Sequence, residues 1–229
     1  MGEADMGKGR TGQEGMLLKG FGGRIKAVVF DCDGVMFDTA DANRIYYNRV
    51  LAYFGKPPLT EEQFVNVHML TVKGALEYLF PEMDSLKPVY QFMGRVGYNE
   101  FIPYMIMEPG LRELLRQLKE SGTIRAVATN RTNTMPAVLE EHNLKDDFDM
   151  VVTAADVENP KPSPDQLLKI LDHYGLSSGE LLFIGDSEYD AIAAGRAEVV
   201  FVAFRNNSLK AQFYSDSMAE IGRILGVDR

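Results

Sequence analysis

Short runs of mainly apolar residues recur along the chain, and stretches whose apolar residues repeat at helical spacing lie between them. Mainly apolar runs of this length are typical of strands that are buried on both faces of a parallel sheet. The runs are residues 25–30, 124–128, 150–153, 181–184 and 199–204. The helical stretches are residues 111–119, 135–141, 164–174 and 189–196. This alternation predicts an α/β fold with a doubly wound parallel sheet and right-handed crossovers.

One long interval, residues 38–108, interrupts the alternation because it contains no convincing strand. Its apolar residues recur at helical spacing, for example at Ile45, Val50, Leu51 and Phe54. We therefore expect a helical cap domain that is inserted into the α/β core. The predicted divisions are a flexible, glycine-rich leader at 1–23, a core domain at 24–37 and 109–229, and the cap at 38–108.

Composition and charge narrow the class of protein. The 229 residues are 45% hydrophobic, which suffices for one sizeable core with a small inserted domain. A net charge of −9 argues against a nucleic-acid binder, because such proteins attract phosphate groups with excess basic residues. No apolar run approaches the ~20 residues that span a membrane, and the single cysteine, Cys32, excludes an intrachain disulfide. We expect a cytoplasmic protein without nucleic-acid or membrane partners, either monomeric or homodimeric.

Two aspartates, Asp31 and Asp33, come directly after the first predicted strand and are followed by Gly34. A turn accounts for part of this pattern, since glycine readily adopts a positive φ. A calcium-binding loop does not account for it, because Val35 and Met36 occupy the positions of its third ligand and its glycine. A catalytic or metal-binding role therefore needs support from the other strand ends.

Two further aspartates, Asp186 and Asp190, follow the fourth predicted strand. Ligands of open α/β sheets bind at the carboxyl ends of the strands, so we expect these residues to share one cleft with Asp31 and Asp33. A pair of like charges about 4 Å apart costs about 4 kcal/mol at an effective dielectric constant of about 20. A cation would offset this repulsion, and hard oxygen ligands with an open position favour Mg²⁺.

Polar residues follow the second and third predicted strands at the same sheet edge. Thr129 and Asn130 offer a hydroxyl and backbone N–H groups, although these residue types also begin helices. Lys161 lies between Pro160 and Pro162, whose rings stiffen the backbone around it. Most lysines are solvated surface residues, but this rigid frame favours a functional lysine here.

Four motifs, FDCDGVMFDT, ATN, KPSPD and GDSEYD, follow one another along the chain and resemble those of the haloacid dehalogenase-like hydrolase superfamily. The resemblance covers nearly the whole chain from Ile25 onward. It is specific to members with a helical cap after the first strand, such as phosphoglycolate phosphatases and β-phosphoglucomutases. It implies a Rossmann-like core and a Mg²⁺-dependent phosphatase whose substrate is a small phosphorylated metabolite, phosphoglycolate-like or a sugar phosphate.

The resemblance also implies a role for each motif residue. Asp31 would be the nucleophile that forms an aspartyl-phosphate, and Asp33 would act as general acid and then as base. Mg²⁺ would be coordinated by Asp31, Asp186 and the backbone carbonyl of Asp33, with Asp190 supporting or joining these ligands. The phosphate group would contact two side chains and two turn residues: Thr129, Lys161, Gly34 and Asn130.

Other functions stay open to different degrees. A dehalogenase is disfavoured, because dehalogenases resemble one another in lacking an aspartate at the position of Asp33. A phosphomutase of the β-phosphoglucomutase type shares all four motifs and stays a direct alternative. A non-catalytic binding protein is less favoured, since every charged motif residue is present. In the cap, Lys73 and Arg95 are candidates for contact with an anionic substrate, although solvated charges on helix faces are more usual.

Overall fold

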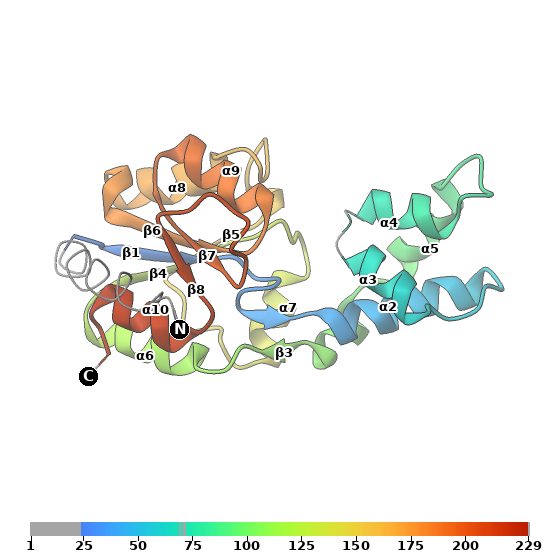
Figure 1. Ribbon diagram of the computed structural model, residues 1–229, viewed down its shortest axis with the longest axis horizontal. Helices are drawn as coiled ribbons and strands as arrows, with labels where there is room; N and C mark the ends of the chain where they lie inside the picture. Colours follow the sequence, from blue (N-terminus) through green and yellow to red (C-terminus); the bar gives the residue numbers. More distant parts are fainter. Residues whose placement is uncertain (1–23, 69, 71, 229) are drawn as a thin grey trace, which may run out of the picture. The chain divides into compact units, whose positions relative to one another are not determined.

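The computed structural model describes residues 24–68, 70 and 72–228 (Figure 1). The leader predicted at residues 1–23 lies outside the described residues. Residues 24–37 and 107–228 form one compact unit, and Asp38–Ile106 form a second. The expected cap ended at residue 108, so the two divisions differ only at the return to the core.

A six-stranded parallel sheet in the order β5-β4-β1-β6-β7-β8 forms the centre of the first unit. Its strands are β1 (Ala27–Phe30), β4 (Ile124–Ala128), β5 (Met150–Val152), β6 (Leu181–Gly185), β7 (Val200–Phe204) and β8 (Phe213–Ser215). The helices are α6 (Leu111–Glu120), α7 (Met135–Glu141), α8 (Asp165–Tyr174), α9 (Glu188–Ala197) and α10 (Met218–Leu225). In Figure 1, α8 and α9 cover one face of the sheet, while α6 and α10 cover the other. The predicted doubly wound α/β fold is confirmed.

The sequence patterns predicted five of these strands and four of these helices, but they missed β8 and α10. β8 is only three residues long and partly exposed at the sheet edge, so it carries no continuous apolar run. α10 does carry a local signal, because Ser217 caps it by accepting a hydrogen bond from the N–H of Glu220. This serine and glutamate, three residues apart, are typical of a helix start and could have indicated the helix.

The order of the central strands positions the site. β1 lies between β4 and β6, with Phe30 in register with Val127 on one side and Ile184 on the other. All four residues of β1 are buried. The chain continues past Phe30 at the carboxyl edge, where the N–H of Asp31 donates to the carbonyl of Ile184 at 2.9 Å. Asp31 is thereby bonded to the end of the strand that precedes Asp186.

The second unit is mainly helical. Its elements are α2 (Ala40–Tyr53), α3 (Glu61–His68), α4 (Val72–Leu79), α5 (Lys87–Val96) and the 3-10 helix η1 (Asn99–Tyr104). Aromatic rings pack in its interior: the Tyr46 and Phe101 centroids are 5.0 Å apart, and those of Phe54 and Phe80 are 5.4 Å apart. The chain leaves and re-enters the core through β2 (Phe37–Asp38) and β3 (Ile106–Met107), which pair in a two-stranded sheet.

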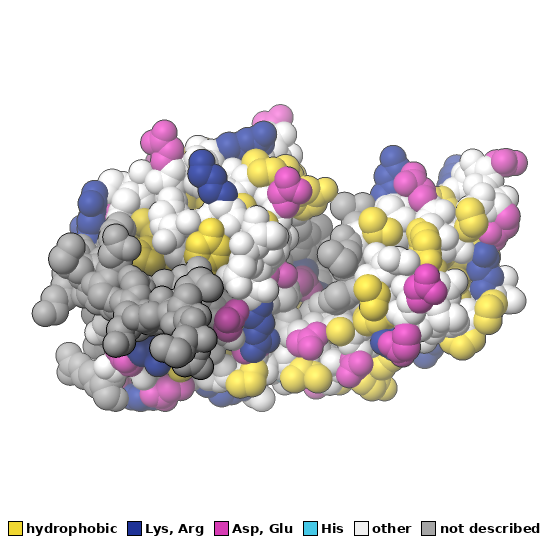
Figure 2. Space-filling view, in the orientation of Figure 1, with side chains coloured by type: hydrophobic (Ala, Val, Ile, Leu, Met, Phe, Trp, Pro, Cys, Tyr) yellow, Lys and Arg dark blue, Asp and Glu magenta, His cyan; other side chains and the backbone are white. Residues whose placement is uncertain are grey.

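The surface shows mixed charge. In Figure 2, lysine and arginine side chains on this face are interspersed with acidic ones and do not gather into a broad basic patch. Within the described part of the chain, no helix combines the length and the apolar character that a membrane crossing requires.

Candidate active site

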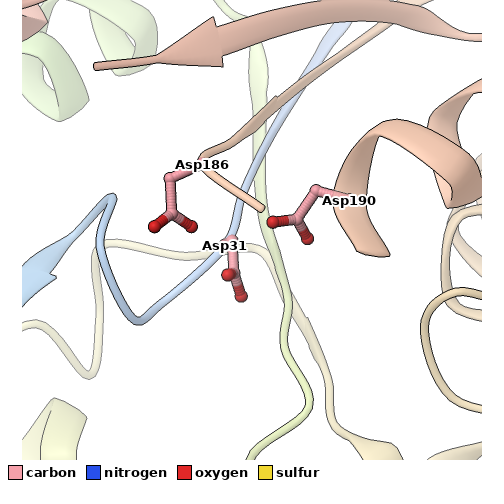
Figure 3. Close-up of side chains that lie close together, drawn as sticks. All are labelled: Asp31, Asp186 and Asp190. Carbon is pink, nitrogen blue, oxygen red and sulfur yellow. The ribbon is translucent and has the colours of Figure 1, made fainter. Parts of the chain in front are cut away.

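Three aspartates meet at the carboxyl edge of the core sheet. Asp31 follows β1, Asp186 follows β6, and Asp190 lies in the first turn of α9. One carboxylate oxygen from each residue lies within 4.8 Å of those of the other two. Figure 3 shows the three side chains arriving from separate segments. The pairing of β1 with β6 explains the meeting, because it places the two strand ends side by side.

Lys161 is buried among these acids. Its ammonium Nζ lies 2.8 Å from Asp31 Oδ1 and 2.6 Å from Asp190 Oδ1, and its side chain is only 2% exposed. It also donates to the carbonyl of Ala128 at 2.9 Å, so it reaches the end of β4 as well. The side-chain amide of Asn130 donates to the backbone carbonyl of Lys161 at 2.9 Å. Asn130 therefore holds the loop that carries the lysine.

Asp190 has hydrogen-bond partners at both of its carboxylate oxygens. One of its oxygens is bonded to Lys161, and the other accepts hydrogen bonds from the N–H and the hydroxyl of Ser187 at 3.0 and 2.6 Å. The residue also needs room, because a Cβ at Gly185 would lie 2.4 Å from the Asp190 Cβ. With both oxygens engaged in this way, Asp190 suits a role behind the ligands better than one as a direct metal ligand.

Gly34 provides space for Asp186. Its φ is +75°, and a Cβ at this position would lie 2.0 Å from Asp186 Oδ2. The N–H of Gly34 donates to the carbonyl of Phe37 at 2.9 Å, so this N–H is engaged within the turn. On the other side, the side-chain amide of Asn206 donates to the carbonyl of Asp186 at 2.8 Å. Asn206 follows β7, and no sequence motif singled it out.

Thr129 is held at several atoms. It is 1% exposed, and its N–H donates to the carbonyl of Val152 at 3.1 Å. Its own carbonyl accepts a 2.7 Å hydrogen bond from the buried amide of Gln166. Its hydroxyl accepts from the N–H of Arg131 at 3.1 Å, which leaves the hydroxyl proton as a donor for another group.

The Asp33 side chain does not join the three buried acids in this structure; it pairs with Arg131. The guanidinium donates from Nε and Nη2 to the two carboxylate oxygens at 2.8 and 2.6 Å. The side chain of Asp33 is 40% exposed, whereas that of Arg131 is 10% exposed. Sequence reasoning missed Arg131, although the arginine directly follows the ATN motif.

Burial and mutual interaction shift the pKa values of Asp31, Asp186 and Lys161. Burial raises the pKa of Asp31 well above its usual range; Lys161 opposes this shift, and Asp190 and Asp186 add to it. Burial, with a contribution from Asp190, raises the pKa of Asp186 to about 7. Burial by itself lowers the pKa of Lys161, but Asp190 and Asp31 outweigh this effect and raise it.

The donor set fits a divalent cation. Three carboxylates beside one ammonium leave two negative charges in a buried site. Such an excess is unfavourable unless the acids take up protons or a cation binds. Clustered carboxylate oxygens are typical ligands of hard divalent cations. The residues present therefore match a metal of this class.

The candidate substrate-contacting residues of the helical unit have local partners. Lys73 Nζ lies 3.7 Å from a carboxylate oxygen of Glu77, and the lysine side chain is 74% exposed. Arg95 donates to the carbonyl of Gln91. A hollow of about 930 Å³, with Tyr90 in its lining, adjoins Lys73 and contains none of the acids of the core. These contacts favour the interpretation that Lys73 and Arg95 are solvated charges on exposed helix faces.

Comparison with known proteins confirms the family resemblance. The family described as haloacid dehalogenase-like hydrolase matches residues 28–204. A crystal structure of a HAD-superfamily hydrolase, subfamily IA, variant 1, from Geobacter sulfurreducens is 41% identical; it covers 89% of this chain and 97% of its own, with a TM-score of 0.80. The phosphoglycolate phosphatase of Vibrio cholerae is 28% identical over 183 residues, 76% of this chain and 81% of that protein. The pyrophosphatase PpaX of Halalkalibacterium halodurans is 26% identical over 227 residues, 89% of this chain and 98% of that protein.

Proposed function

This chain belongs to the haloacid dehalogenase-like hydrolases, and we propose that it is a Mg²⁺-dependent phosphatase of small phosphorylated metabolites. It acts on phosphate esters, and phosphoglycolate-like and sugar phosphates are the leading substrates. The observation that carries the proposal is the buried contact of Lys161 with both Asp31 and Asp190, beside Asp186. The phosphatase names of several relatives support it. We retain the expectation of a cytoplasmic monomer or homodimer.

The first half of the reaction transfers the phosphoryl group to the protein. A carboxylate oxygen of Asp31 attacks phosphorus, and a bond between the two forms as the bond from phosphorus to the ester oxygen breaks. The electron pair of the broken bond stays on the ester oxygen, which takes a proton from Asp33 and leaves as an alcohol. Lys161 orients the attacking carboxylate and offsets negative charge that the phosphate brings into the buried site.

The second half returns Asp31 to its starting form. A water molecule attacks phosphorus and gives a proton to Asp33, which now acts as the base. The bond between phosphorus and the Asp31 oxygen breaks, and its electron pair restores the Asp31 carboxylate. Inorganic phosphate leaves, and Asp33 again holds the proton that the next substrate requires.

The proposed metal ligands are Asp31, Asp186 and the backbone carbonyl of Asp33, with Asp190 in support. When bound, Mg²⁺ would neutralise charge on the phosphoryl oxygens and so lower the electrostatic barrier to attack. Thr129 is proposed to donate its hydroxyl proton to a phosphate oxygen. Asn130 is proposed to act through the loop of Lys161, because its side chain is bonded to that loop.

The decisive experiment measures phosphate release by the purified protein from p-nitrophenyl phosphate and a panel of phosphorylated metabolites, with and without Mg²⁺. Asp31→Asn should lower kcat by at least about 10³-fold, because the amide is a poor nucleophile. Asp172→Asn is the matched control, since Asp172 is an exposed residue of α8 outside the site. Undiminished activity in Asp31→Asn would overturn the mechanism, and a product that keeps phosphate at a new position would identify a phosphomutase.

A further inference from the structure

The backbone of Arg131 is fixed on both sides. Its N–H donates to the hydroxyl of Thr129 at 3.1 Å, and its carbonyl accepts from the N–H of Ala154 at 2.9 Å. The first bond ties it to the turn after β4, and the second ties it to the segment after β5. The side chain of Arg131 therefore starts from an anchored position at the carboxyl edge of the sheet.

The guanidinium of Arg131 connects this anchored backbone to Asp33 through hydrogen bonds. Nη1 donates to the hydroxyl of Thr134 at 3.3 Å, while Nε and Nη2 donate to the two oxygens of Asp33. A planar guanidinium in such a two-bond arrangement restricts both the place and the plane of a carboxylate. Asp33 needs this restriction, because its side chain is 40% exposed on a turn and would otherwise sample several rotamers.

One turn thus orders three parts of the site. Residues 129–131 present the hydroxyl of Thr129, bond the loop of Lys161 through Asn130, and hold Asp33 through Arg131. A general acid contributes only when its proton lies within hydrogen-bond reach of the leaving oxygen. An anchor that sets the location of Asp33 relative to this turn therefore affects proton delivery without touching the substrate.

We propose that Arg131 is a positioning residue that holds Asp33 in place beside the substrate, and that one Asp33 oxygen leaves the guanidinium to carry the proton that the leaving group takes. The proposal rests on the phosphatase mechanism proposed above. It makes a distinctive claim about substrates: a basic leaving group needs the proton from Asp33, whereas a weakly basic one leaves largely without it. Loss of Arg131 should therefore harm the two kinds of substrate unequally.

The test compares kcat/KM of Arg131→Met on phenyl phosphate and p-nitrophenyl phosphate, which differ mainly in the basicity of the leaving oxygen. This parameter reports the steps up to the first irreversible one, which includes departure of the alcohol. We expect a loss of about tenfold or more for phenyl phosphate and of less than about threefold for p-nitrophenyl phosphate. Equal losses for the two substrates would overturn the proposal.

A double variant provides a second, independent readout. If Arg131 acts through Asp33, adding Arg131→Met to Asp33→Asn should lower kcat/KM for phenyl phosphate little beyond Asp33→Asn alone. Losses that multiply in the double variant would show that Arg131 acts elsewhere, and would overturn the proposal. Wild-type protein that hydrolyses neither substrate nor any member of the metabolite panel would instead count against the proposed function.

Two further variants separate positioning from folding. Arg125→Met removes another two-bond arginine–aspartate pair, with Asp149, near the opposite end of β4, and should lower both kcat/KM values equally if it lowers them at all. Arg131→Lys keeps the charge without the planar fork and should show the same unequal losses in a milder form. Melting temperatures of all variants monitor folding, and if Arg131→Met does not fold, the substrate pattern of Arg131→Lys decides.

Discussion

Acidic residues are paired with cations differently at the two ends of the core sheet. Near the amino ends, ion pairs match one acid to one cation: Arg125 with Asp149, and Lys26 with Glu180. Hydrogen bonds from Lys26 and from Ser177 lower the pKa of Glu180 to about 2. Burial opposes the same effect at Asp149, but Arg125 outweighs it and lowers the pKa of that carboxyl. Each of these acids is therefore more favourable as a carboxylate in the folded protein than in the unfolded chain.

The buried acids at the carboxyl ends show the reverse pattern. There Lys161 serves two acids, and the pKa values of Asp31 and Asp186 are raised, chiefly by burial and then by neighbouring carboxylates. Folding holds these acids together at a cost in stability that a bound cation can offset. The sign of the pKa shift thus distinguishes these two paired acids from Asp31 and Asp186 of the candidate site.

The largest effect on this comparison should come from Lys161→Met, which removes the cation from the crowded end. We expect the free energy of unfolding in the absence of Mg²⁺ to fall by about 3–5 kcal/mol, because buried carboxylates lose their partner. Urea denaturation at neutral pH, followed by circular dichroism, measures this change. A loss of less than about 1 kcal/mol would contradict the buried charge balance described here.

Asp186→Asn should change how stability depends on pH. The pKa of Asp186 is about 7 in the folded protein, against an ordinary value of 3.8. Its contribution to the free energy of unfolding is therefore complete at pH values below 3.8 and is lost as the pH rises to about 7. In EDTA, the melting temperature of Asp186→Asn relative to wild type should therefore rise between about pH 5 and about pH 8.

Magnesium gives the same variant a second readout. Added Mg²⁺ should raise the wild-type melting temperature more at about pH 8 than at about pH 5, because protons compete with the metal for the carboxylates. Asp186→Asn should show little of this stabilisation. A variant that responds to Mg²⁺ as the wild type does would remove Asp186 from the metal site.

Gly34→Ala should weaken metal binding by crowding Asp186. The new Cβ would lie 2.0 Å from Asp186 Oδ2, so the carboxylate must move. We expect the apparent affinity for Mg²⁺, measured by titrating the hydrolysis rate, to fall by about 10–100-fold. Gly122→Ala is the matched control, since Gly122 shares the φ of +75° but a Cβ there would meet no described atom within 4 Å. Equal losses in the two variants would mean that backbone strain, not crowding, is responsible.

The smallest effect should come from Lys26→Met at the balanced end. Its side chain is 62% exposed, and exposed ion pairs add little to stability because water and salt screen them. We expect the melting temperature to change by no more than about 2 °C, with no change in the Mg²⁺ titration. A large loss of stability would show that the amino-end pairs matter more than their exposure indicates.

The elements of the core were predictable because their signals are local. A run such as residues 181–184 is apolar at consecutive positions, and burial of both strand faces requires this pattern. Asp31 and Asp186 were equally predictable as strand-end residues, since Asp31 directly follows such a run and only Gly185 separates Asp186 from another. The edge strand β8 was not, because its three residues are only partly buried and leave no apolar run to detect.

Local sequence patterns indicated most core strands and helices and the acids that follow the strands, because side-chain periodicity and turn residues act over a few positions. The specific side-chain contacts, in contrast, depend on residues that lie far apart in the sequence. Arg131 and Asp33 are 98 positions apart, and their contact depends on β1 lying next to β4. The buried contacts of Lys161 and the closeness of Gly34 to Asp186 likewise depend on sheet order. Sheet order is set by packing across the whole domain, and no local pattern records it.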